Sequence, residues 1–113
     1  MKKVIIRSEK ENEYYQTELM TMRAFWNIHE PGCNEHYLIH VLRKSSDYLK
    51  DISRVAEIDG KIVGAIFYSK AWIDDGKRKH EIVTFGPLAI DPMYQNQGIG
   101  KLLIKETIKL VKK

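Results

Sequence analysis

A glycine-containing segment in the last quarter of the chain, Gln95–Lys101, has the residue types of a site that binds phosphate groups. It follows an apolar run that ends at Ile90 and precedes a stretch of helical periodicity, so unpaired N–H groups and the positive end of a helix dipole meet there. Gly98 and Gly100 have no Cβ, which allows a bulky anion to approach the main chain. The spacing therefore predicts a pyrophosphate-like group held mainly by backbone donors.

Two other families of glycine loop that bind nucleotides do not fit this segment. A P-loop requires glycine where Gln95 stands and serine or threonine where Leu102 stands. A dinucleotide fingerprint requires a third glycine at the position of Leu103 and a parallel β-α-β unit around it. Neither type of nucleotide site is therefore expected.

The segments that must position this loop read as strands and helices in the order β-α-α-β-β-β-α. The assignment rests on β-branched runs bounded by turn residues and on apolar residues at helical spacing. The predicted elements are Val4–Ile6, Tyr14–Trp26, a helix from Asn34 to residues 44–46, Ser53–Ile58, Lys61–Trp72, Lys79–Ile90 and Gln97–Lys113. This order predicts an α/β (α+β) fold with a mixed, mostly antiparallel sheet, in a single domain over residues 1–113.

Two dipeptides predict local features of that sheet. Asp59-Gly60 can supply both positive φ angles of a tight hairpin turn between two strands. Gly86-Pro87 interrupts the strand Lys79–Ile90, because proline cannot donate to a sheet ladder and glycine packs little. We therefore expect a bulge or a gap in pairing there.

The composition restricts the class of protein and its compartment. The net charge of +4 favours an anionic partner, but it does not choose among nucleic acid, an acidic membrane and a phosphorylated cofactor. Apolar runs are far shorter than the ~20 residues of a membrane-spanning helix. The first seven residues hold too few apolar side chains for a secretory signal. We expect a cytoplasmic protein that binds no membrane, and the single Cys33 agrees with a reducing compartment.

The strand end Gly86–Pro92, followed by Gln-x-x-Gly-x-Gly, resembles motif A of the GNAT superfamily of N-acetyltransferases. The resemblance is close over this stretch, whereas upstream only the order of the elements matches. It implies a GNAT-like acyl-CoA N-acyltransferase fold, in which the fourth strand splays from its neighbour and acyl-CoA enters the gap. The main chain of Leu88, Ala89 and Ile90 would then pair with the pantetheine arm. The pyrophosphate would be held by Gln95, Asn96, Gln97, Gly98, Ile99, Gly100 and Lys101.

The reaction implied by the resemblance is direct transfer of an acetyl group from acetyl-CoA to a primary amine of a small molecule or protein. It requires no metal and no covalent enzyme intermediate, but the amine must be neutral to attack. Some relatives carry a glutamate general base at the position of Thr84. Threonine can instead hold a water that relays the proton. Glu81 and His80 on the same strand are the other candidates for the general base, if the bulge alters the register of the strand.

Relatives continue after the last helix with further strands and a helix, which supply the usual tyrosine general acid. This sequence ends at Lys113, so the resemblance implies a GNAT fold that lacks its C-terminal part. An exposed sheet edge would then favour a homodimer. The alternative function is a non-catalytic acyl-CoA-binding module or sensor, suggested by Thr84 and by the absent part. The acceptor amine is not readable, because loops and that absent part determine it.

Other noticeable side chains have a simpler structural interpretation. His29, Cys33 and His36 have no fourth ligand nearby, so no metal site is expected. His29, Glu30 and His36 would border the acceptor cleft in the resembled fold, but we expect surface loop residues. The lysine-rich last helix offers few side chains for base recognition, so no nucleic-acid partner is expected. The aromatic residues at helical spacing are expected in the core: Tyr14, Tyr15, Phe25, Trp26 and Tyr37.

Overall fold

The computed structural model describes residues 3–26 and 33–111. Its elements are β1 (Ile5–Arg7), α1 (Tyr14–Phe25), α2 (Glu35–Leu42), β2 (Arg54–Ile58), β3 (Lys61–Asp74), β4 (Lys79–Ile90) and α3 (Ile99–Val111). Short 3₁₀ turns precede α1 and α3. The predicted order β-α-α-β-β-β-α is therefore confirmed, with boundaries that shift by a few residues. Within the described ranges, no helix is long and apolar enough to cross a membrane.

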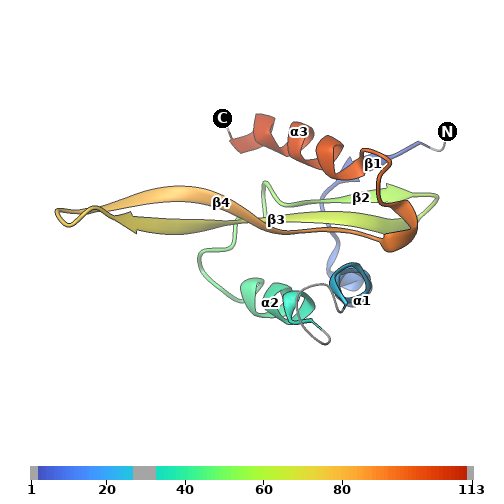
Figure 1. Cartoon of the computed structure of the whole chain (residues 1–113), viewed down its shortest axis with the longest axis horizontal. Coiled ribbons are helices and arrows are strands. Elements are labelled where there is room, and N and C mark those ends of the chain that lie inside the picture. The colour runs from blue at the N-terminus through green and yellow to red at the C-terminus, as the bar shows by residue number, and fades with distance from the viewer. Residues whose placement is uncertain (1–2, 27–32, 112–113) are drawn as a thin grey trace.

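The four strands form one sheet in the order β1-β2-β3-β4, and all three strand pairs are antiparallel. The β2–β3 turn is Asp59-Gly60, whose φ angles of 51° and 80° are those that a tight hairpin requires. Helices α1 and α2 cover one face of the sheet and α3 covers the other (Figure 1). The predicted α/β class with a mostly antiparallel sheet is confirmed.

The core lies on both faces of the inner half of β3. Residues 62–68 of this strand are all buried. Phe67 belongs to the apolar cluster under α1 and α2, whereas Ile66 and Tyr68 belong to the cluster under α3. Burial on both faces explains why this stretch is nearly continuously apolar instead of alternating.

The inward face of α1 differs from the prediction. The buried residues are Thr17, Met20, Thr21 and Ala24. The two threonines can be buried because their hydroxyls donate to backbone carbonyls four residues earlier, Thr21 to Thr17 at 2.9 Å and Thr17 to Glu13 at 3.1 Å. Three small side chains and one methionine therefore form the contact surface with the sheet.

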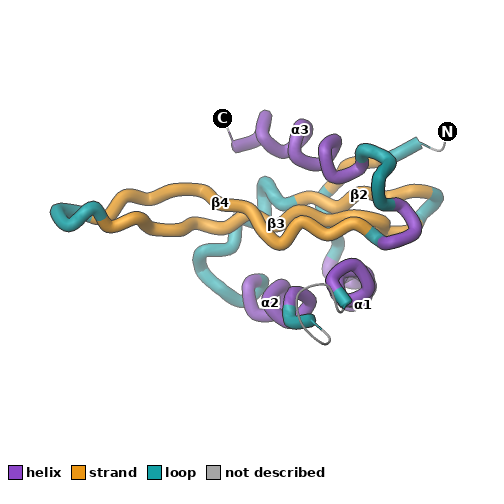
Figure 2. The backbone as a smooth tube through the Cα atoms, viewed as in Figure 1, coloured by secondary structure: helices purple, strands orange, loops and turns teal. Residues whose placement is uncertain are grey.

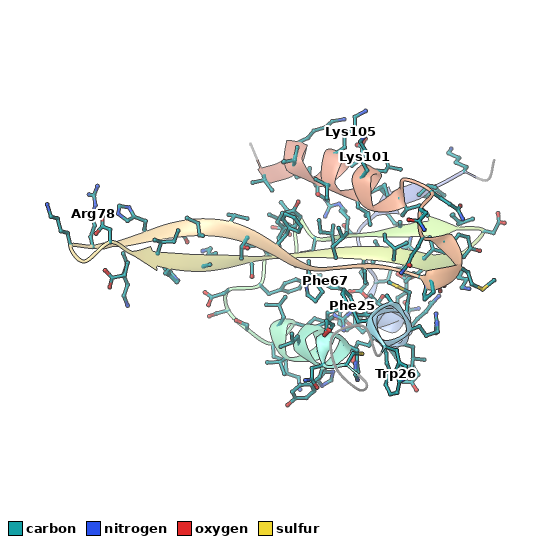
Figure 3. The ribbon with its side chains drawn as sticks, viewed as in Figure 1. Phe25, Trp26, Phe67, Arg78, Lys101 and Lys105 are labelled. Atoms are coloured by element: carbon teal, nitrogen blue, oxygen red, sulfur yellow. The ribbon has the colours of Figure 1, made fainter. Side chains whose placement is uncertain are left out.

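The prediction that the helical aromatic residues pack in the core is wrong for three of them. Tyr15 is 73% exposed, and Trp26 and Tyr37 are also exposed. Figure 3 shows Trp26 on the side of α1 that faces away from the sheet, whereas Phe25 lies between α1 and the sheet near Phe67. Tyr15 and Trp26 remain outside because small residues of α1 bring that helix close to the sheet.

A buried arginine fixes α2 beside α1. The Arg43 guanidinium lies 4.1 Å from the centre of the Tyr14 ring and 2.8 Å from a Glu9 carboxylate oxygen, and it also pairs with Glu18. Burial raises the pKa of Glu9, although Thr17 and Arg43 lower it in part. This cluster holds α2 in place over the face of the sheet that carries Phe67.

The outer halves of β3 and β4 extend beyond the helices as a two-stranded hairpin, residues 70–85, here called the arm (Figure 2). Strand pairing continues to Asp74↔Lys79 at its tip. Where the arm joins the body, pairing changes from Ile66↔Leu88 to Tyr68↔Phe85, so β4 holds one extra residue. The bulge predicted at Gly86-Pro87 is therefore confirmed.

Helix α3 approaches the sheet most closely at Gly64 in the middle of β3. A Cβ added there would lie 3.0 Å from Ile90 Cδ1, 3.2 Å from Leu103 Cδ1 and 3.3 Å from Ile99 Cγ2. A methyl group at this position would require the ends of these three side chains to move by a few tenths of an ångström. Gly64 therefore allows α3 and the end of β4 to pack closely on the sheet.

Candidate functional site

The loop that connects β4 to α3 borders a cavity of about 410 Å³. Its walls come from the end of α1, the end of β4, the loop and the first turn of α3. The lining residues are Ala24, Phe25, Leu88, Ile90, Tyr94, Gln95, Asn96, Gly98, Ile99, Gly100 and Lys101. We call this space the loop cavity. It is lined by eight of the ten residues expected to bind the cofactor. Ala89 and Gln97 are not among its lining residues.

Backbone amide groups at the start of α3 are available to this loop cavity. The first helical hydrogen bond runs from the Leu102 amide to the Gly98 carbonyl at 3.0 Å. The amides of Ile99, Gly100 and Lys101 precede that bond and have no acceptor within the helix. Gly98 has a φ of 83°, a conformation that side chains rarely adopt. The geometry therefore suits an anion bound by the helix N-terminus.

Two glutamine side chains hold the loop itself. The Gln95 amide group donates to the Ile90 carbonyl at 3.1 Å, and the Gln97 amide group donates to the Met93 carbonyl at 3.5 Å. Lys101 is exposed and lies on α3 one turn before Lys105 (Figure 3). Of these side chains, Lys101 is the one that offers positive charge at the rim of the loop cavity.

Asp91 anchors the loop to the body, a role that the sequence analysis missed. Its buried carboxylate accepts a hydrogen bond from the Met93 amide at 3.0 Å and lies 3.1 Å from Arg23 and 3.8 Å from Lys61. Burial raises the pKa of Asp91, but the Met93 amide and the two cations outweigh it and lower the pKa below its usual value. An ionised Asp91 thus ties the loop to α1 and β3.

The segment Leu88–Ile90 of β4 forms the edge of the described sheet. It pairs with β3 through Leu88↔Ile66, Ala89↔Ala65 and Ile90↔Gly64, and among the described strands β4 has a partner on that side only. An edge strand presents unpaired N–H and C=O groups along its free side. The edge at Leu88–Ile90 can therefore pair with an extended ligand.

A larger cavity of about 750 Å³ lies between α2 and the bulge of β4. We call it the helix cavity. Its lining residues are Phe25, Glu35, Leu38, Val41, Leu42, Ser45, Ser69, Gly86, Pro87 and Leu88. It shares Phe25 and Leu88 with the loop cavity, so the two cavities adjoin along the end of β4.

Of the three residues considered for proton transfer, Thr84 and Glu81 lie on opposite faces of β4. Thr84 pairs with Ser69, which lines the helix cavity, and paired residues place their side chains on the same face of a sheet. Glu81 lies three residues away and therefore on the other face, with its carboxylate 3.4 Å from Lys70 Nζ. His80 is near the tip of the arm, where it contacts Asp75 at 2.8 Å.

The comparisons with known proteins decide the family. Residues 11–113 match the Acetyltransferase (GNAT) family. The chain belongs to this family. A search of curated proteins found no match.

Solved structures of GNAT proteins share the fold of this family member. A GNAT acetyltransferase from Brucella melitensis in complex with acetyl-CoA is 27% identical with a TM-score of 0.85, and the match covers 99% of this chain and 70% of that one. YhbS from Escherichia coli in complex with CoA is 24% identical with a TM-score of 0.77, covering 96% of this chain and 56% of that one. An acetyltransferase from Vibrio fischeri is 20% identical with a TM-score of 0.68, covering 96% and 86%.

The histidine and cysteine residues near α2 have ordinary local contacts in this GNAT chain. The Cys33 thiol lies 3.6 Å from Nδ1 of His36 in the first turn of α2. His29 and Glu30 lie outside the described residues. In the part of the chain that the structure describes, no three acidic, histidine or cysteine side chains gather as a metal site would require.

Proposed function

We propose that this chain binds acetyl-CoA along the end of β4 and transfers its acetyl group to a primary amine. The observation that carries the proposal is that the two cavities adjoin at the end of β4, where both are lined by Phe25 and Leu88. An elongated ligand with an anionic end and an apolar arm matches this shape. Family membership and relatives crystallised with acetyl-CoA or CoA support the same ligand class.

The pyrophosphate would occupy the loop cavity. The free amides at Ile99–Lys101 and the dipole of α3 would stabilise its negative charge. Asp91 would contribute indirectly, by keeping the loop in position through Arg23 and Lys61. Lys101 would add one positive charge at the rim, which is a smaller effect because the side chain is exposed.

The pantetheine arm would pair with the edge of β4 at Leu88–Ile90 and bring the thioester to the bulge at Gly86-Pro87. At that point β4 departs from regular pairing with β3, so its backbone groups are available to a ligand. The thioester would then open into the helix cavity, whose walls are mainly apolar. These apolar walls would pack against the uncharged end of the ligand.

The chemistry is attack of a neutral amine on the thioester carbonyl. A C–N bond forms, the C–S bond breaks, the amine loses one proton and the CoA thiolate takes up one proton. Thr84 lies on the face of the sheet that carries Ser69 of β3, so we propose that it holds a water that relays the amine proton. Glu81 faces away from the helix cavity and has no part in this scheme.

The test is a calorimetric titration of the chain with acetyl-CoA, comparing Gly98→Asp with Gly76→Asp. These two glycines are matched, because both have positive φ angles, 83° and 90°, and a Cβ at either would meet nothing within 4 Å. Gly76 lies at the tip of the arm. We expect Gly98→Asp to weaken binding about tenfold or more through charge repulsion, and Gly76→Asp to leave it unchanged.

Equal binding by both variants would contradict the assignment of the loop cavity to the pyrophosphate. Binding that is lost in Gly98→Asp, without release of CoA thiol when primary amines are supplied, would favour the alternative of a non-catalytic acyl-CoA-binding module. Release of thiol that requires an amine would support the transferase.

A further inference from the structure

The helix cavity has the features of a binding site for a particular class of acceptor. It lies beside the bulge of β4 and continues the loop cavity past Leu88. A molecule in it would therefore lie next to the place where the proposed function puts the thioester. The chemistry of its walls is what selects that molecule.

The α2 wall of the cavity is apolar and largely uncovered. Leu38 and Val41 are 55% and 47% exposed, although they occupy successive turns of the same helix face. Leu42 lies on the same side and packs against the core. Across the cavity, Pro87 and Leu88 present further apolar surface from β4. Apolar groups in this arrangement favour a ligand with an apolar body.

One carboxylate stands in this apolar surround. Glu35 is the charged residue among the described residues that line the helix cavity, and the serines of the lining, Ser45 and Ser69, are neutral. It is half-buried at the start of α2. Within residues 3–26 and 33–111 it forms no ion pair, in contrast to Glu9, Glu13 and Glu18 of the N-terminal region. A carboxylate of this kind attracts a single cationic group.

We infer that the acceptor is a small primary amine with one positive charge and an apolar body, held by Glu35 and by the apolar wall of α2. The inference rests on the proposed function, because it names the substrate that would occupy the cavity next to the thioester. A polycationic amine gains less, because Glu35 can pair with one of its charges and the apolar walls offer no partner for the others. Glu35 binds the ammonium form on entry, before the amine loses its proton.

The inference is tested by binding and needs no turnover. Ligand-observed NMR titrations compare 2-phenylethylamine with 2-phenylethanol, which has the same apolar body without the charge, and with spermidine, a polycation. Each titration is run with and without CoA, which has no acetyl group to transfer. We expect 2-phenylethylamine to bind about tenfold more tightly than either of the other two compounds.

Three variants assign the contacts. Glu35→Gln should remove the advantage of 2-phenylethylamine over 2-phenylethanol and leave the affinity for acetyl-CoA unchanged. Leu38→Asn should weaken binding of both aromatic compounds; its side chain is more than half exposed, so the fold tolerates the change. Glu106→Gln is the matched control, because it removes the same charge on α3 across the sheet and should change none of these affinities.

The possible failures are distinguishable. If the Glu35→Gln variant keeps the preference for the amine, or if spermidine binds as tightly as 2-phenylethylamine, the inference is overturned. It is also overturned if neither aromatic compound binds, with or without CoA. If the amine binds as expected but acetyl-CoA does not, the proposed function fails and the helix cavity remains an amine-binding site.

Discussion

The body and the arm of this sheet are built from the same two strands but differ in what covers them. In the body, residues 62–68 of β3 lie between α1 and α2 on one face and α3 on the other. In the arm, Trp72 and Phe85 are 55% and 49% exposed, although their backbones pair as regularly as those of the body. Strand pairing and core formation are thus separate properties of one hairpin, and the helices determine the second.

The boundary between the two regions coincides with the candidate site. Gly86-Pro87 ends the arm, and both residues line the helix cavity. The cavity exists because α2 covers the sheet as far as this boundary while β4 departs from regular pairing there. A ligand at this place would be supported by packed structure on its inner side and by an uncovered hairpin on its outer side.

The largest difference is expected between two phenylalanines, Phe67 in the body and Phe85 in the arm. Phe67 is 2% exposed, so Phe67→Ala should lower the free energy of unfolding by about 3–5 kcal/mol. Phe85→Ala should cost less than about 1.5 kcal/mol, since half of its ring already faces solvent. Urea unfolding followed by circular dichroism measures both values. Equal costs would show that the arm is as well packed as the body.

A smaller difference is expected between two aspartates, Asp91 in the body and Asp75 at the tip of the arm. Asp91→Asn should lower the free energy of unfolding by about 1.5–3 kcal/mol. The neutral side chain of asparagine cannot replace the negative charge that faces Arg23 and Lys61. Asp75→Asn should leave the unfolding midpoint unchanged, although the hydrogen bond to His80 lowers the pKa of Asp75 to about 2. Its partner is exposed, so solvent screens the pair.

The pH dependence of stability checks the role of Asp91 independently. Because its pKa is lower in the folded chain than in the unfolded chain, ionised Asp91 stabilises the fold above about pH 4. That contribution should be lost as the pH falls through the folded pKa. Asp91→Asn should therefore unfold with a shallower pH dependence in this acidic range. A variant that loses stability with acid as steeply as the original chain would contradict the assignment.

The smallest effect is expected from Trp72→Ser in the arm, a change of less than about 0.5 kcal/mol in the free energy of unfolding. Amide hydrogen exchange should be faster in residues 70–85 than in β2, because the arm has few buried contacts. A clearly larger loss, with a midpoint that rises with protein concentration, would instead show that a second copy covers the arm, as expected for a homodimer.

Features that depend on a few neighbouring residues were predictable from the sequence. Asp59-Gly60 specifies its turn because its φ angles suit a hairpin regardless of what surrounds it. Gly86-Pro87 specifies a bulge because neither residue supports regular pairing. The anion-binding loop before α3 was also predictable, because its glycines and the start of the helix lie next to each other in the sequence.

Features that depend on tertiary packing were not predictable. The aromatic residues were expected on the inward face of α1, but Thr17 and Thr21 can lie there because their hydroxyls donate to carbonyls within the chain segment of the helix. Asp91 looked like a residue that ends a strand, and only the folded chain brings Arg23 to it. The residues next to Glu35 in the sequence do not indicate a binding role. Glu35 lines the helix cavity only because α2 lies beside the bulge of β4.

Gly64 has a consequence for how this chain can be altered. It lies in the middle of a buried strand, but it affects how α3 packs on the sheet, because the side chains of Ile99 and Leu103 pack against it. A single methyl group at Gly64 would press on the ends of the Ile90, Ile99 and Leu103 side chains without changing any residue of the loop itself. Substitutions intended to change the ligand preference of the loop should therefore leave Gly64 unchanged.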